Sequence, residues 1–191
     1  NDGEYTRIST QNSGYTTYPG YPKLPVYTMV YHVNPFTEYE FTLNVISSHW
    51  ENNIRISPAQ IGIRNLDEKG ASEGIYSTDS VDPYPQNNLW ISDRQKMRGE
   101  EFITISVTPF TYYPASNELE ILDNIEIEIS EIGSRENPHY QAKPRSRVFE
   151  KYMEKFSLNY MTRINEDFQP PTILYICGGS TLEEQKMQEL L

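Results

Sequence analysis

Apolar and polar residues alternate along several stretches of the chain with the period of two that is typical of β-strands. The alternation runs through residues 25–33 and 39–47, and the turn-forming residues NPFTE lie between them, so we predict a hairpin there. The clearest case is ELEILDNIEIEIS (118–130), which follows a strand-like stretch at 101–110 across the turn YYPASN. One apolar and one polar face per strand indicate antiparallel sheets, and we predict a β-sandwich over residues 25–132.

The pattern changes after residue 132. Residues 133–147, GSRENPHYQAKPRSR, are polar, basic and contain proline, which is typical of a linker. Apolar residues then recur at the spacing of a helix with one apolar face, which predicts a helix over 147–160. These residues are Phe149, Tyr152, Met153 and Phe156.

The C-terminal residues have a third pattern. The apolar run TILYIC ends in Gly178 and Gly179 and leads into a capping-box sequence that begins at Ser180 or Thr181. A buried strand that enters a helix is how an α/β domain begins. Because one strand and one helix cannot bury each other, we expect residues 172–191 to be the truncated start of a larger domain.

These patterns predict a mainly β chain: an antiparallel β-sandwich, then a linker helix and a truncated α/β start. The predicted segments are an extended lead-in (1–24), the sandwich (25–132), a linker that holds the helix (133–171) and the start of the α/β domain (172–191).

Composition supports a β-rich chain and limits its partners. Fifteen tyrosines suit half-buried sheet surfaces, and thirteen prolines suit edges and turns. The formal net charge is −11, whereas binding to nucleic-acid phosphates needs a broad basic surface, so we expect no nucleic-acid partner. No apolar run approaches the roughly 20 residues that span a bilayer. The chain begins at Asn1 without a charged-then-apolar leader, and we expect a signal peptide to have been removed or left out.

Candidate catalytic and metal-binding residues are few. Cys177 is the single cysteine and ends the predicted buried strand, where a structural role is commoner than a nucleophilic one. The histidines show no metal-ligand spacing, and we expect neither a metal nor a cofactor. They are His32, His49 and His139. Trp50 and Trp90 fit packing at the core or an edge, which is the commoner role, or a platform for carbohydrate.

A basic cluster contrasts with the acidic chain. The stretch DRQKMRGEEF (93–102) holds Arg94, Lys96 and Arg98 just before the strand predicted at 101–110. The plain interpretation is a solvated cationic surface, which contributes little to stability. A functional interpretation of these cations follows from the resemblance of other stretches of the chain to a known protein family.

Five stretches, in order, resemble the N-terminal prodomain of the gingipain-like cysteine proteases. GYPKLPVYTMVYHV has the family's Gly-x-Pro-x-Leu-Pro-Val opening, and NVISSHWE is similar to the stretch that follows it. Residues 97–130 match the most recognisable block: Arg-Gly, a strand ending in a Pro-aromatic pair, Tyr-x-Pro and alternating isoleucines. FEKYMEKFSLNY resembles the helix that closes the prodomain, and PTILYICGG resembles the first strand of the caspase-like catalytic domain. The resemblance covers roughly residues 20–185.

This resemblance implies an inhibitory and folding-assisting prodomain from a cysteine protease zymogen. The fragment then lacks the catalytic Cys/His dyad and is not itself an enzyme, while its parent is a cysteine endopeptidase. The implied partner is the cognate caspase-like catalytic domain. Members of the family are exported, often by type IX secretion, so we expect a secreted or cell-surface location.

The resemblance also implies a role for the basic cluster. In arginine-specific relatives, an arginine on a prodomain loop before this strand enters the S1 pocket and blocks it. Arg98 matches the family's Arg-Gly, and its neighbours Arg94 and Lys96 are the alternatives.

Release of such a prodomain requires a cut in the chain. Arg145, Arg147 and Arg163 lie in linker-like sequence on either side of the predicted helix, where proteolysis is easiest. We expect cleavage after Arg163 in preference to the other two, because it lies nearest to the catalytic domain.

Two other functions fit the residues. A non-catalytic β-sandwich that uses Trp50, Trp90 and surface tyrosines would bind carbohydrate or a cell-surface partner. A structural module that only assists the folding of the following domain would need the sheet but not the cations of the loop.

Overall fold

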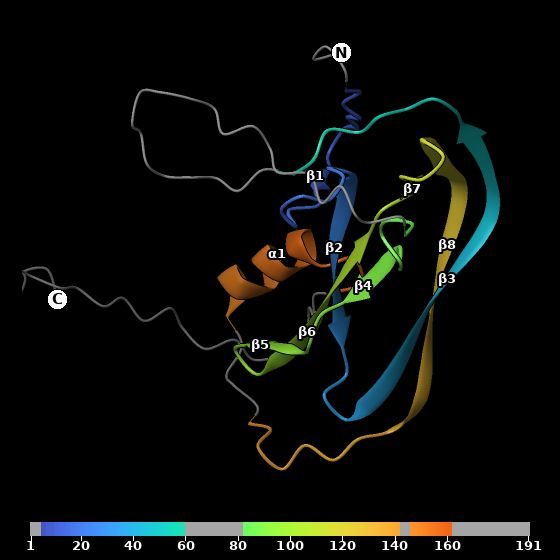
Figure 1. The fold of residues 1–191 in the computed structure, drawn as a ribbon. Helices are drawn as coiled ribbons and strands as arrows, with labels where there is room; N and C mark the ends of the chain where they lie inside the picture. The colour runs from blue at the N-terminus through green and yellow to red at the C-terminus, as the bar shows by residue number, and fades with distance from the viewer. Residues whose placement is uncertain (1–4, 60–81, 142–145, 162–191) are drawn as a thin grey trace, which may run out of the picture.

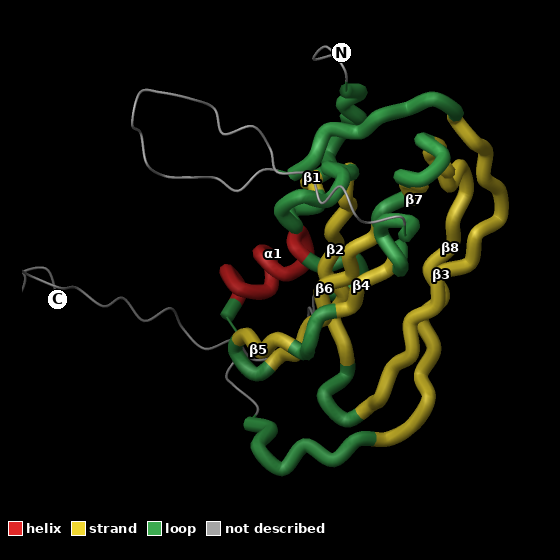
Figure 2. The backbone as a smooth tube through the Cα atoms, in the orientation of Figure 1, coloured by secondary structure: helices red, strands yellow, loops and turns green. Residues whose placement is uncertain are grey.

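The computed structural model describes residues 5–59, 82–141 and 146–161. Eight strands and one helix follow one another along these residues (Figures 1 and 2). The elements are β1 (Gly14–Tyr15), β2 (Pro25–Val33), β3 (Thr37–Glu51), β4 (Leu89–Ile91), β5 (Gln95–Met97), β6 (Glu100–Val107), β7 (Phe110–Tyr113), β8 (Glu118–Ser134) and α1 (Arg147–Phe156).

The strands form two antiparallel sheets, which confirms the predicted mainly β sandwich. The first sheet has the order β1-β2-β6-β4, with β5 also paired to β6, and the second has the order β3-β8-β7. In Figure 1 the long β3–β8 ribbon lies on one side of the first sheet and α1 on the other. No helix among the described residues is long and apolar enough to cross a membrane.

The prediction that residues 25–33 and 39–47 form a hairpin is wrong. β2 pairs with β6, from Tyr27 opposite Val107 to Val33 opposite Glu101, whereas β3 pairs with β8. The turn between β2 and β3 instead crosses from one sheet to the other. Their apolar faces then meet across the sandwich, where the rings of Tyr31 and Phe41 lie 6.4 Å apart. The alternation predicted the apolar faces but not which strands share a sheet.

The stretch predicted as one strand at 101–110 is divided between the sheets. β6 ends at Val107, and the chain crosses at residues 108–109 to begin β7, which forms the hairpin with β8. The side-chain amide of Asn88 supports the crossing by donating to the carbonyl oxygens of Thr108 (2.9 Å) and Phe110 (3.2 Å). A proline at position 109 cannot donate to a ladder, which suits a break between strands.

The helix is shorter than the predicted 147–160 because β2 binds the residues that follow it. Leu158 donates its backbone N–H to the carbonyl oxygen of Val30 (2.9 Å). The side chain of Asn159 accepts from the N–H of His32 (2.7 Å) and donates to its carbonyl oxygen (2.8 Å). The chain after Phe156 therefore runs along β2 instead of continuing the helix.

Strand β6 has apolar contacts on both faces. Ile103 and Ile105 join Val33 in the core between the sheets, where they pack against residues of β3 and β8. On the opposite face, Phe102 packs with Met153 of α1 and with Tyr160. The helix is thus a third layer, fixed to the sandwich through Phe102.

This packing predicts that alanine substitutions at two adjacent helix residues change the free energy of unfolding by very different amounts. Met153 is fully buried, so Met153→Ala should lower the free energy of unfolding by about 2–4 kcal/mol. Tyr152 is 51% exposed, and Tyr152→Ala should change it by no more than about 0.5 kcal/mol. Urea denaturation of both variants measures the difference, and similar losses would contradict the packing of α1 through Met153.

Candidate functional site

The basic cluster lies on the hairpin formed by β5 and β6. Met97 pairs with Glu100, which leaves Arg98 and Gly99 as the two residues of the turn. Both have positive φ, 53° and 88°, as type I′ hairpin turns require. Such turns favour Asn-Gly, and a left-handed conformation costs a residue other than glycine about 1–2 kcal/mol. An arginine therefore occupies a position that local backbone energetics disfavour.

Arg98 is exposed at the tip and lies against the helix layer. Its guanidinium carbon is 5.7 Å from the centroid of the Phe149 ring, which is within the range of a cation–π contact. The first turn of α1 therefore supports the side chain at the tip of the hairpin.

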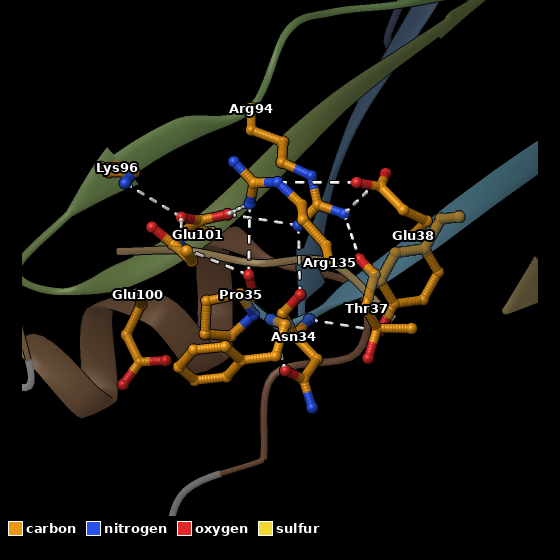
Figure 3. A network of polar contacts seen from close by, with 12 residues as sticks. Asn34, Pro35, Thr37, Glu38, Arg94, Lys96, Glu100, Glu101 and Arg135 are labelled. Carbon is orange, nitrogen blue, oxygen red and sulfur yellow. Dashed lines mark hydrogen bonds and ion pairs between the residues drawn. The ribbon is translucent and has the colours of Figure 1, made fainter. Parts of the chain in front are cut away.

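Behind the tip, the carboxylate of Glu101 is buried among cations (Figure 3). Glu101 lies on β6 in phase with Ile103 and Ile105, so its side chain faces the sandwich, and the residue is 0% exposed. Its oxygens contact four side chains that come from β5, from the residue just before β5 and from the segment after β8. These are Arg135 (3.0 Å), Arg94 (3.2 Å), Lys96 (3.2 Å) and Asn137 (2.8 Å).

Two of these cations, Arg94 and Arg135, also bind the segment that joins β2 to β3. Arg94 donates to the carbonyl oxygens of Asn34 (3.1 Å) and Thr37, and Arg135 donates to that of Pro35 (3.2 Å). Both guanidinium groups also lie within 4 Å of the Glu38 carboxylate, at 3.7 and 3.6 Å. The network therefore joins the hairpin to the sheet crossing and to the end of β8.

Two opposing effects set the pKa of Glu101. Burial raises the pKa, but hydrogen bonds from Asn137, Lys96 and Arg94 and the nearby charge of Arg135 outweigh burial and hold it below its ordinary value. Glu101 is therefore an ionised carboxylate at neutral pH, and it stabilises the fold through these contacts.

The structure separates the three cations of the predicted inhibitory loop. Arg94 and Lys96 point to Glu101, while Arg98 is at the turn, so the three do not form one exposed basic patch. Of the predicted processing residues, Arg147 is exposed and begins α1. Arg145 and Arg163 lie outside the described residues, as does Cys177.

Sequence reasoning missed Glu101, Arg135 and Asn137 as members of the network. One signal was available for Glu101, because it alternates in phase with Ile103 and Ile105 and a buried carboxylate needs partners. No comparable signal identifies Arg135 or Asn137, since their approach depends on where β8 ends.

The histidines and tryptophans are dispersed. His32 contacts Glu100 (2.9 Å) and His49 contacts Asp123 (2.8 Å), and no group of three or more potential metal ligands occurs within the described ranges. Trp50 lies on β3 against the ring of Tyr113 (4.9 Å between centroids), and Trp90 lies on β4 of the other sheet. The structure does not place the two tryptophans on one sheet face.

Comparison with known proteins supports the prodomain resemblance. The family model described as Propeptide_C25 matches residues 1–165. The fold is similar to that in the complex of RgpB pro- and mature domains from Porphyromonas gingivalis, with 18% sequence identity, a TM-score of 0.58 and 78% of each chain covered. It is also similar to gingipain K of Porphyromonas gingivalis in a structure concerned with zymogenic latency, with 18% identity, a TM-score of 0.54, and coverage of 64% of this chain and 71% of that one.

No curated protein sequence matches the chain. The family match and the shared fold confirm the gingipain-type prodomain that the sequence predicted. The expected start of a catalytic domain, residues 172–191, lies beyond the matched residues and outside the described ones.

The network predicts a loss of stability in acid that depends on Glu101. Because its pKa is lower in the folded chain than the ordinary value of about 4.3, the unfolded chain binds more protons as the pH falls through that range. Stability should therefore decline from about pH 4.3 towards the lower folded pKa. Glu101→Gln should lower the free energy of unfolding by about 3 kcal/mol at neutral pH and make the acid decline shallower.

Urea denaturation between pH 3 and 7 measures both effects. Glu126→Gln is the matched control, because Glu126 is exposed on β8, and it should retain the stability and acid decline of the wild type. Parallel pH curves for the wild type and Glu101→Gln would contradict the role of this carboxylate.

Proposed function

The chain belongs to the Propeptide_C25 family, and on that premise we propose that it keeps a gingipain-type cysteine protease latent by placing Arg98 in the active-site cleft. As a propeptide it is the non-catalytic part of a zymogen whose parent is a protease. Its proposed partner is the catalytic domain of the same precursor. Its proposed location is outside the cell, by the type IX route that the resemblance implies.

The observation that carries this proposal is the arginine at the turn. Arg98 is exposed and has a φ of 53°, although an asparagine or glycine would occupy that position with less strain. Backbone strain that the surrounding structure maintains is concentrated at functional sites. A cation presented in this way fits a role in which the side chain itself is needed.

The other two cations of the loop support Arg98 rather than compete with it. Arg94 is bound to Glu101 and to the loop between β2 and β3, so its release into a cleft would leave a buried carboxylate with fewer partners. Lys96 is half exposed but also contacts Glu101 at 3.2 Å. We therefore assign the blocking role to Arg98 and positioning roles to Arg94 and Lys96.

The geometry of the hairpin favours tight docking. A side chain on a two-residue turn between paired strands has little backbone freedom to lose on binding, which lowers the cost of association. A guanidinium that meets a carboxylate in a pocket makes charge-assisted and bidentate hydrogen bonds. The parent protease would then recognise Arg98 by the chemistry of a basic specificity pocket.

The same turn protects the inhibitor from cleavage. The peptide bond after Arg98 joins two residues with positive φ inside a hairpin, and attack on a bond requires it to be aligned with the nucleophile. Because the hairpin is anchored through Glu101, its turn resists the change of backbone conformation that would align the peptide bond after Arg98 with the nucleophile.

Release of the propeptide is proposed to follow cleavage near α1. A cut after Arg163 leaves the helix attached to the sandwich. A cut after Arg145 or Arg147 separates α1 from the sandwich in the covalent chain, and Arg147 lies in the first turn of the helix, where the backbone is less accessible to a protease. Because cleavage after Arg163 leaves α1 joined to the sandwich, we favour Arg163 as the cleavage site.

Arg98→Asn is expected to abolish inhibition without unfolding the protein. Removing a buried charge contact at an interface costs about 2–5 kcal/mol, so the inhibition constant against the cognate catalytic domain should rise at least about 30-fold. Asparagine suits the turn, and the free energy of unfolding should stay equal or rise by about 1 kcal/mol. Hydrolysis of a small peptide substrate and urea denaturation give the two readings.

Arg94→Ala is the comparison, because it should lower stability and weaken inhibition less than Arg98→Asn does. If Arg98→Asn inhibits as well as the wild type, Arg98 is not the blocking residue. If the wild type does not inhibit and binds glycans instead, the carbohydrate-binding alternative is favoured.

Processing is tested in the complete precursor with mass spectrometry of its products. The wild type should yield a new N-terminus at Ile164, and Arg163→Ala should delay activation or divert the cut to Arg145 or Arg147. Replacing all three arginines by alanine should leave the precursor uncut. Normal activation of that triple variant would exclude these sites.

A further inference from the structure

Helix α1 carries two adjacent apolar stripes, and the sandwich covers only one of them. Phe149 and Met153, four residues apart, face the sheet together with Phe102. Val148, Tyr152 and Phe156 repeat the same spacing one residue earlier, which places them on a neighbouring face of the helix. Their exposures are 76%, 51% and 41%. The apolar surface of the helix is therefore wider than the part of it that packs against the sandwich.

The exposed stripe has an ordered aromatic surface. The rings of Tyr152 and Phe156 stack with centroids 5.3 Å apart and an interplanar angle of 18°. Leu158 and Met161, just after the helix, are also exposed, at 66% and 84%. Soluble proteins rarely expose a contiguous apolar patch of this kind unless it binds something.

The stripe is continuous with the tip of the β5–β6 hairpin. Phe149 lies between the exposed stripe and the buried Met153 on the helix, and its ring contacts the guanidinium of Arg98. Met97, next to Arg98, is 39% exposed. The arginine and the apolar stripe therefore belong to one surface of the molecule.

Cations border this surface in a chain whose net charge is −11. Arg98 lies along the Phe149 side. Lys151 and Lys155 are exposed three residues after Val148 and Tyr152, and residues at that spacing are neighbours on a helix surface. An apolar area with a cationic border is complementary to an apolar surface rimmed by carboxylates.

We propose that the α1 stripe, defined as Val148, Tyr152 and Phe156, is a second docking surface for the catalytic domain of the cognate protease. This inference rests on the proposed function. A specific interface buries about 800 Å² on each partner, which a two-residue turn cannot supply. The stripe provides aromatic contact area beside the turn, and aromatic residues and arginine are the types enriched where binding energy is concentrated.

On this arrangement α1 has two tasks. Its inner stripe fixes the helix to β6, and its outer stripe contacts the catalytic domain on the same side as Arg98. The partner surface is apolar, carries carboxylates at its edge and lies beside the cleft that receives the arginine.

The test is the affinity of residues 1–191 for the cognate catalytic domain with its nucleophile replaced, measured by calorimetry. Tyr152→Ser/Phe156→Ser should raise the dissociation constant at least tenfold. Ile46→Ser/Ile132→Ser removes two exposed apolar side chains of the β3–β8 sheet and should change it less than twofold. Both double variants should keep the wild-type melting temperature, which shows that binding and not folding has changed.

Inhibition by Arg98→Asn distinguishes this inference from the proposed function. Loss of inhibition in Arg98→Asn with wild-type affinity in the stripe variant overturns the docking surface and leaves the blocking role intact. Loss of affinity in the stripe variant, with full inhibition by Arg98→Asn, supports the docking surface and contradicts the blocking role.

Two further measurements identify the occupant of the stripe. Hydroxyl-radical labelling of Tyr152 and Phe156 should be strong in the isolated chain and weak in the complex. Weak labelling in both would show that the chain covers its own stripe, and would overturn the proposal. A dimer that the stripe variant dissociates in sedimentation experiments, without a change in affinity for the catalytic domain, would overturn it in favour of a second copy.

Discussion

The ionised carboxylate of Glu101 is the constraint on which this end of the molecule depends. A charge removed from water must be paired and hydrogen-bonded, and Glu101 is fully buried on the central strand β6. Its partners come from β5 and its lead-in and from the segment after β8, and they also bind the loop between β2 and β3. One buried charge thereby fixes the relative positions of parts that belong to both sheets.

The hairpin at this end combines a firm base with a strained tip. Arg94 and Lys96 are bound to Glu101, and Arg98 is held with positive φ beyond them. A strained residue persists only where its surroundings maintain it, and the network and the β5–β6 pairing do so here. The three cations of this short stretch therefore differ in position: Arg94 and Lys96 stabilise the fold through Glu101, and Arg98 lies exposed at the turn against Phe149.

Helix α1 connects the sandwich to this tip. Met153 and Phe102 fix the helix to β6, the residues after it run along β2, and Phe149 lies under the guanidinium of Arg98. The helix is therefore part of the prodomain fold and not a free linker element. Its position also brings an apolar stripe next to the hairpin, because Phe149, beside that stripe, contacts the guanidinium of Arg98.

The amino-acid pattern alone predicted that the chain is mainly β, that a strand occupies residues 25–33 and that a helix begins at 147, because the spacing of apolar residues reflects which side chains are buried. It also identified the family, since short motifs in order survive at low identity. The pairing of β2 with β6, the end of the helix at Phe156 and the contact between Arg94 and Glu101 became evident only from the folded chain. Alternation reports a buried face but not what covers it, and these contacts join residues far apart in the chain.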